Sequence, residues 1–143
     1  MPVFSPELKK RVGNMINSLP LDLLIRIKNA YLAGREATYV PLSQTNRRLL
    51  LLLKKHQLIS DFTTDSNHPR QFLVELLYRD LQPALTQVSI YSKPGRRIYQ
   101  KVASLPWGKT QNSLIIVSTS SGLLSQRQAK KAHLGGEIIA ELY

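Results

Sequence analysis

Four hydroxyl side chains stand in a row near the C-terminal end of the chain, in the segment Ser118-Thr119-Ser120-Ser121-Gly122. A hydroxyl group both donates and accepts hydrogen bonds, so this segment can meet phosphate oxygens, 2′-hydroxyls and base edges in the shallow groove of RNA. It also precedes a predicted helix, whose N-terminal dipole would favour an anion. Taken alone, the same five residues are more typical of a simple polar turn between a strand and a helix.

Cationic side chains occur on both sides of this segment. Lys93, Arg96 and Arg97 surround a Pro-Gly turn, and Lys130 and Lys131 belong to the predicted helix that follows. Each of the five suits a phosphate contact. Each also suits an ordinary solvated charged face.

The whole chain is basic, with 20 Lys and Arg against 9 Asp and Glu, a formal charge of +11 and a pI of about 10.2. Such a balance favours a polyanionic partner, either nucleic acid or an anionic membrane. The part up to Arg70 has 11 basic and 5 acidic residues and the rest has 9 and 4, so the charge belongs to the folded body. A membrane role is disfavoured, because the cations do not line one amphipathic helix and no apolar run approaches the ~20 residues that span a bilayer.

The residues that most enzymes need are missing or badly spaced. There is no Cys, and the three His residues lack the close spacing of metal ligands. No G-x-S-x-G, H-E-x-x-H or phosphate-binding P-loop motif is present. We therefore expect a binding protein with no catalytic residue, metal, cofactor or small-molecule substrate.

Residues 20–80 predict an α-β-α-β-β subdomain in which two helices cover a small sheet. The expected elements are a helix over 21–31, an extended segment over 37–41, a helix from Ser43 to His56, and strands over 58–63 and 71–77. Gly34 is expected to stop the first helix, and residues 65–69 have the composition of a turn. Residues 1–19 form an N-terminal extension.

Residues 81–143 predict a second subdomain, mostly antiparallel β with one short helix, which makes the chain an α/β (α+β) protein of two small subdomains. The expected strands are 87–91, 97–102, 114–118 and 137–143. Ser125 and Gln128 form a capping box at the start of the helix, and Gly135-Gly136 are expected to stop it. In the last strand, Ile139 is expected on one face and Ile138 and Ala140 on the other.

The string STSSGLLSQRQAKKAHLGGEIIAELY resembles the C-terminal signature of the S8 family of small-subunit ribosomal proteins, which reads STSxG, a short helix, GGE and a final strand. The upstream segments SKPGRRIY, ISDF and LLIRIKNA are similar to family motifs as well. The resemblance extends from about Pro20 to Tyr143. It implies a ribonucleoprotein component that binds a helical element in the central domain of the small-subunit rRNA, mainly through the C-terminal part, and acts early in assembly beside neighbouring ribosomal proteins.

The resemblance also implies roles for single residues. Ser118, Thr119 and Ser120 would contact the RNA, Tyr99 would help to build the same surface, and Glu137 would orient the loop or meet the RNA backbone. Gly122, Gly135 and Gly136 would permit tight backbone geometry. From the residues alone, a half-buried strand tyrosine is the better interpretation of Tyr99. The alternative for Glu137 is an ordinary surface carboxylate.

Two further expectations concern biological context. Bacterial family members also bind an mRNA, so a free-standing regulator of an mRNA is the alternative function. Where bacterial members read P-S-S-K-L-K before the second helix, this chain reads Pro41-Leu42-Ser43-Gln44-Thr45-Asn46 and lacks both lysines. Together with the N-terminal extension, this departure favours a mitochondrial ribosome over a plastid or bacterial one.

Overall fold

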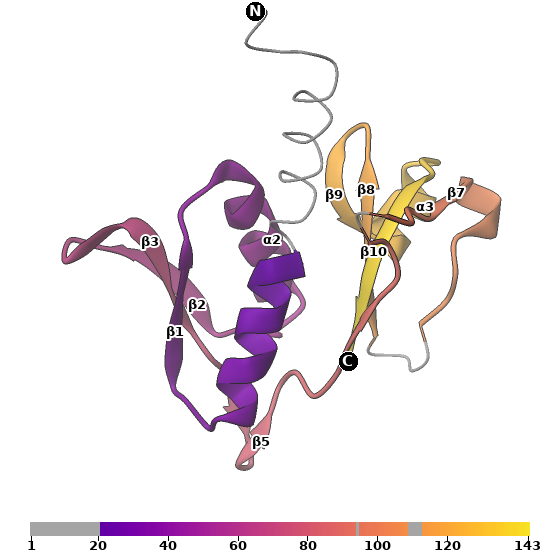
Figure 1. Ribbon diagram of the computed structural model, residues 1–143. Coiled ribbons are helices and arrows are strands. Elements are labelled where there is room, and N and C mark those ends of the chain that lie inside the picture. The colour runs from indigo at the N-terminus through magenta and orange to yellow at the C-terminus, as the bar shows by residue number, and fades with distance from the viewer. Residues whose placement is uncertain (1–20, 94, 109–112) are drawn as a thin grey trace, which may run out of the picture.

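The computed structural model describes residues 21–93, 95–108 and 113–143, so the expected extension over residues 1–19 lies outside the described residues. Two groups of elements follow one another along the chain (Figure 1). The first group contains a helix over residues 21–32, β1 (Ala37–Pro41), α2 (Gln44–Lys55), β2 (Asp61–Asp65) and β3 (His68–Glu75). The second contains β6 (Val88–Ile90), β7 (Tyr99–Gln100), the 3-10 helix η1 (Val102–Ser104), β8 (Leu114–Thr119), β9 (Gly122–Ser125), α3 (Gln126–Lys131) and β10 (Gly136–Leu142). The predicted α-β-α-β-β order and the mostly β second part are confirmed.

Local signals fix the ends of the first two helices. Gly34 adopts φ +68° just after the first helix, and the Arg35 N–H donates to the Ala30 carbonyl at 3.0 Å, as expected of a glycine stop. The Ser43 side chain accepts a hydrogen bond from the Asn46 N–H at 3.0 Å and caps α2.

The first sheet has the order β1-β3-β2, with both neighbouring pairs antiparallel. The two helices cover one of its faces, and no element of the described residues covers the opposite face (Figure 1). The β2–β3 turn is tighter than predicted, because Asp65 already pairs with His68. The predicted strand over 58–63 starts too early, since Leu58 and Ile59 are both buried and enter the core from a loop, without the alternation of a strand.

The second sheet has the order β6-β10-β8-β9, and β7 pairs with the start of β10. Two expectations were wrong here and one strand was missed. The strand predicted over 97–102 shortens to β7 because the chain turns into η1, β9 was not anticipated, and α3 ends at Lys131 well before the glycine pair. His133, with φ +58°, takes the left-handed position after α3. The Ser125–Gln128 capping box is confirmed.

A β-bulge shifts the register of β10 against β8 between Ile138 and Ala140. As expected, Ile138 and Ile139 contribute to different hydrophobic clusters. Ala140 joins the cluster of Ile139 instead of that of Ile138, so its predicted face was wrong. The bulge inserts one extra residue into β10, so Ile139 and Ala140 lie on the same face although they are neighbours in the strand.

The main hydrophobic cluster runs through both groups of elements. It contains Leu23, Leu50 and Val74 from the first group and Ile116 and Leu142 from the second. A smaller cluster lies between α3 and the second sheet. In the part of the chain that the structure describes, no helix is both long and apolar enough to cross a membrane.

Candidate RNA-binding surface

The hydroxyl segment forms the tight turn of the β8–β9 hairpin. Ser118 and Thr119 end β8, Ser120 and Ser121 make the turn, and Gly122 opens β9 with φ +102°. The Thr119 hydroxyl donates to the Gly122 carbonyl at 2.9 Å and accepts from the Ser121 N–H at 3.1 Å. Thr119 therefore holds the turn in shape, while the side chains of Ser120 and Ser121 are exposed.

The helix dipole does not assist this turn as predicted. The four residues of β9 separate the turn from α3. At ~3.3 Å per residue, the strand places the helix N-terminus about 13 Å away. Hydroxyl and backbone groups of the turn must therefore act without α3.

Three of the predicted residues form a row across neighbouring strands. Glu137 of β10 pairs with Tyr99 of β7 on one side and with Ser118 of β8 on the other. Side chains of directly paired residues project from the same face of a sheet, ~5 Å apart. β7, the start of β10 and the tip of the β8–β9 hairpin accordingly lie at the same end of the sheet (Figure 1).

The environments of Tyr99 and Glu137 differ from what their residue types alone suggested. Tyr99 is 63% exposed, so its ring is open for stacking, and Glu137 is only 7% exposed. No hydrogen bond or ion pair joins the Glu137 carboxylate to another described residue. The residue as a whole is mostly buried, but its carboxylate oxygens are not fully enclosed, so Glu137 can accept a hydrogen bond from a bound molecule.

The other carboxylate of β10 has a different role. Glu141, 1% exposed, accepts a hydrogen bond from the Tyr91 hydroxyl at 2.7 Å. This bond raises the pKa of Tyr91 to about 12. Glu141 thus belongs to the internal structure of the sheet.

The glycine pair gives β10 its close approach to two backbones. A Cβ atom on Gly136 would overlap the carbonyl oxygen of Ser118, and one on Gly135 would lie 2.5 Å from the carbonyl oxygen of Gln100. Real Cβ atoms do not approach backbone this closely. Both glycines are therefore required for the row of Tyr99, Glu137 and Ser118 to form.

The predicted cations do not share one environment. Lys93 and Arg96 are exposed at their turn, where each backbone N–H donates to the other residue's carbonyl at 2.9 Å, and Lys131 is exposed on α3. Arg97 is half-buried. The Lys130 ammonium lies 3.1 Å from the centre of the Trp107 ring, a cation–π contact that the sequence did not indicate.

Two further exposed cations, Lys101 and Arg127, were not singled out from the sequence, because nothing in their local pattern distinguishes them from solvated charges. They still contribute to the charge of the second part of the chain. From residue 81 onward the chain has eight Lys and Arg but only two acidic residues, Glu137 and Glu141, and both of these are buried. The surface of the second part therefore presents cationic side chains without exposed carboxylate side chains, as a polyanion requires.

Comparison with known proteins identifies the family. The sequence model of ribosomal protein S8 matches residues 20–143. The chain belongs to the ribosomal protein S8 family. Relatives include the small ribosomal subunit protein uS8 of Novosphingobium aromaticivorans, 37% identical over 85% of this chain and 94% of the relative, and that of Vibrio atlanticus, 39% identical over 82% and 91%. The small ribosomal subunit protein uS8c of Chlorella vulgaris is 31% identical over 90% of this chain and all of the relative.

Membership in the S8 family gives the general function. The chain is a structural, rRNA-binding constituent of the small ribosomal subunit, and its partners are small-subunit rRNA and neighbouring ribosomal proteins. Members are not enzymes, in agreement with the expectation from the sequence. The relatives are bacterial and chloroplast proteins.

Proposed function

We propose that the β8–β9 turn together with the row of Tyr99, Glu137 and Ser118 is the surface by which the chain recognises a helical element in the central domain of small-subunit rRNA. The observation that carries this proposal is the row itself. Three residues far apart in the sequence meet on one face beside the hydroxyl turn, in a region whose only carboxylate side chains are buried. RNA binding would then belong to the C-terminal subdomain, residues 81–143, with residues 20–80 as its support.

Affinity and selectivity come from different groups in this proposal. Lys93, Arg96 and Lys131 neutralise phosphates, which binds any RNA and weakens with salt. The hydroxyls of Ser118 and Ser120 and the Glu137 carboxylate meet 2′-hydroxyls and base edges, which depends on the shape of the RNA. Tyr99 offers an exposed ring for stacking.

The test is binding of the purified protein to a central-domain rRNA helix and to an unrelated hairpin over a salt series. We expect the variant with Ser118→Ala plus Ser120→Ala to lose its preference for the cognate helix, about tenfold or more, with a similar salt slope. The control is Lys93→Ala plus Arg96→Ala, which should weaken both RNAs alike and reduce the slope by about 2. Equal binding of both RNAs by the unchanged protein would refute the proposed site.

We also propose that the subunit is that of a mitochondrial ribosome. The support is the segment Pro41–Asn46, which lacks the two lysines that bacterial members carry before the second helix. The test is to isolate small subunits from purified mitochondria and from plastids or cytosol of the source cells and to search each for peptides of this chain. Recovery from plastid or bacterial-type subunits alone would contradict this location.

A further inference from the structure

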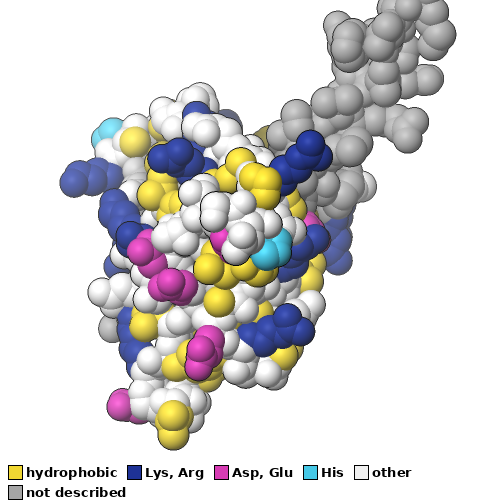
Figure 2. Space-filling model, turned by 90° about the vertical axis from the view of Figure 1, so that its left-hand side faces the viewer, with side chains coloured by type: hydrophobic (Ala, Val, Ile, Leu, Met, Phe, Trp, Pro, Cys, Tyr) yellow, Lys and Arg dark blue, Asp and Glu magenta, His cyan; other side chains and the backbone are white. Residues whose placement is uncertain are grey.

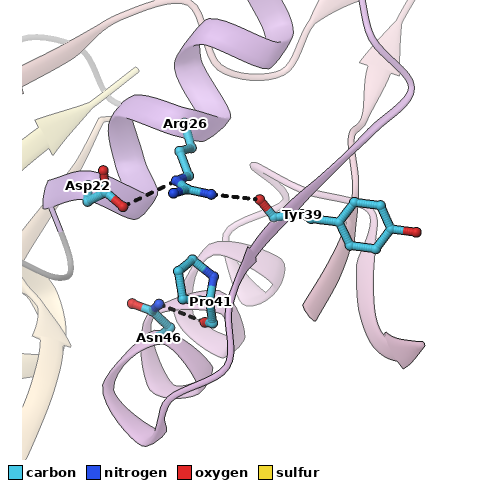
Figure 3. A network of polar contacts seen from close by, with 5 residues as sticks. All are labelled: Asp22, Arg26, Tyr39, Pro41 and Asn46. Atoms are coloured by element: carbon cyan, nitrogen blue, oxygen red, sulfur yellow. Dashed lines mark hydrogen bonds and ion pairs between the residues drawn. The ribbon is translucent and has the colours of Figure 1, made fainter. Parts of the chain in front are cut away.

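In the part of the chain that the structure describes, no element covers one face of the first sheet. Because paired residues share a face, the register places on it the row Ala37, Glu75 and Asp61 and the row Tyr39, Leu73 and Thr63, followed by Pro41 and Gln71. We call these eight residues the outer sheet face. Figure 3 shows the Tyr39 ring directed away from the first helix, whose Arg26 donates to the Tyr39 carbonyl from the opposite side.

Acidic residues gather on and beside the outer sheet face. Of the eight acidic residues in the described part of the chain, Asp61, Asp65 and Glu75 lie on this face, and Glu36 lies at its border, one residue before β1. Figure 2, which faces this side of the molecule, shows acidic side chains among hydrophobic ones, with most Lys and Arg toward the margins. In a chain of net charge +11, such a face is electrostatically unlike the rest of the surface.

Two of these carboxylates, Glu36 and Glu75, lack a counterion among the described residues. Asp61 and Glu75 are directly paired, an arrangement that repels. Lys54 relieves it only for Asp61, with Nζ 3.0 Å from the carboxylate, and lowers the pKa of Asp61. No ion pair or side-chain hydrogen bond joins Glu75 or Glu36 to another described residue, and both are exposed.

The neighbouring part of the face is ordered and apolar. Tyr39 packs against His68 with ring centroids 4.3 Å apart, and its hydroxyl donates to Asp65 at 2.9 Å. Leu73 and Tyr39 are half-buried and lie side by side in the register. A preorganised aromatic and aliphatic surface beside exposed carboxylates suits a protein segment that has both apolar and cationic side chains.

We propose that the outer sheet face docks a Lys- and Arg-rich segment of a neighbouring small-subunit protein. The cations of that segment would pair with Glu75 and Glu36, and its apolar side chains would cover Leu73 and Tyr39. RNA is disfavoured as the occupant because its phosphates would face these carboxylates. The inference requires only membership in a ribosomal subunit, and it stands apart from the proposed rRNA surface on the second sheet.

The first experiment identifies the occupant in intact small subunits. The protein is prepared with Thr63→p-benzoylphenylalanine, which places a photoreactive group on the exposed outer sheet face, or with Gln100→p-benzoylphenylalanine on exposed β7. After irradiation, we expect the Thr63 probe to yield an adduct with a basic segment of one ribosomal protein and the Gln100 probe to yield an adduct with rRNA. An rRNA adduct from Thr63, or no Thr63 adduct while Gln100 reacts, would overturn the inference, whereas failure of Gln100 alone would count against the rRNA surface.

The second experiment tests the charges by competition with unchanged protein for incorporation into reconstituted subunits. Glu36→Gln plus Glu75→Gln should reduce incorporation and the Thr63 adduct about fivefold, while binding to the isolated rRNA helix stays within twofold. The matched control is Gln82→Lys plus Gln87→Lys, which raises the net charge equally at exposed positions away from the outer sheet face. Docking by charge would be refuted if both double variants lost incorporation equally. It would also be refuted if Glu36→Gln plus Glu75→Gln lost none.

Discussion

The two larger sheets of this protein expose opposite charges. The first sheet places Glu36, Asp61 and Glu75 on or beside an uncovered face. The second sheet buries both of its carboxylates, Glu137 and Glu141, and its surroundings expose cations. A net charge of +11 therefore does not describe either surface. The difference teaches that one small basic chain can present separate surfaces for a polyanion and for a cationic protein.

The sheets also differ in regularity. The first has ordinary antiparallel ladders with one register shift beside its hairpin turn. The second contains a bulge in β10, the close approaches of Gly135 and Gly136, and the mostly buried Glu137, whose carboxylate has no donor among the described residues. The irregular sheet is the one that bears the proposed rRNA surface, as expected when close backbone approach positions binding groups.

The largest effect is expected from Gly136→Ala. Its Cβ would meet the backbone of Ser118, which cannot rotate away, so β10 must separate from β8. We expect the free energy of unfolding to fall by about 3 kcal/mol and selective rRNA binding to be lost. The control is Gly95→Ala, where an added Cβ meets no atom within 4 Å and chemical denaturation should change little. Equal stability of the two variants would show that the strands can adjust.

The next effect separates the two buried carboxylates of β10. Glu137→Gln removes a charge that has no donor among the described residues, so stability should be nearly unchanged, while preference for the cognate rRNA helix falls about tenfold. Glu141→Gln weakens the bond from the Tyr91 hydroxyl and should lower the free energy of unfolding by about 1 kcal/mol without changing that preference. If Glu137→Gln costs stability and keeps the preference, Glu137 is structural and the contrast between the two carboxylates fails.

A smaller effect compares one helix end from each part of the chain. Gln57 after α2 and His133 after α3 adopt φ +59° and +58°, in positions where glycine is the usual residue. We expect His133→Gly to raise the free energy of unfolding by about 1 kcal/mol. Gln57→Gly should gain less, because the hydrogen bond from Arg79 to its side chain, 2.8 Å, is lost. Thermal unfolding measures both, and a loss of stability in His133→Gly would contradict the strain argument.

The smallest effect concerns the junction of the two parts, where His56 of the α2 end lies under the influence of Arg127 of α3. Burial, and then the charges of Lys55 and Arg127, lower the pKa of His56. The unfolded chain therefore binds the proton more readily, so stability is present above the ordinary histidine pKa of about 6.5 and declines as pH falls below it. Urea unfolding between pH 7.5 and 5.5 should show this decline, reduced in His56→Gln. If stability declines with pH in His56→Gln as much as in the unchanged protein, groups other than His56 cause the decline.

Much of the fold could be predicted from local sequence. Ser43, Gly34 and the Ser125–Gln128 pair mark helix ends by interactions within a few residues, and each was found where expected. The composition of the hydroxyl segment is also typical of a turn, and the chain turns there between β8 and β9. These features depend on neighbours in the chain, and a sequence displays such neighbours directly.

The tertiary structure alone decided how the candidate binding groups meet. Pairing of β10 with both β7 and β8 brings Tyr99, Glu137 and Ser118 into one row, and it gives Gly135 and Gly136 a purpose other than ending a helix. The strand character of β9 and the bulge that moves Ala140 to the other cluster likewise come from pairing with a distant segment. The burial of Glu137 also comes from this pairing. Contacts between residues far apart in the chain cost loop entropy and are stabilised only by the assembled core, so no local pattern records them.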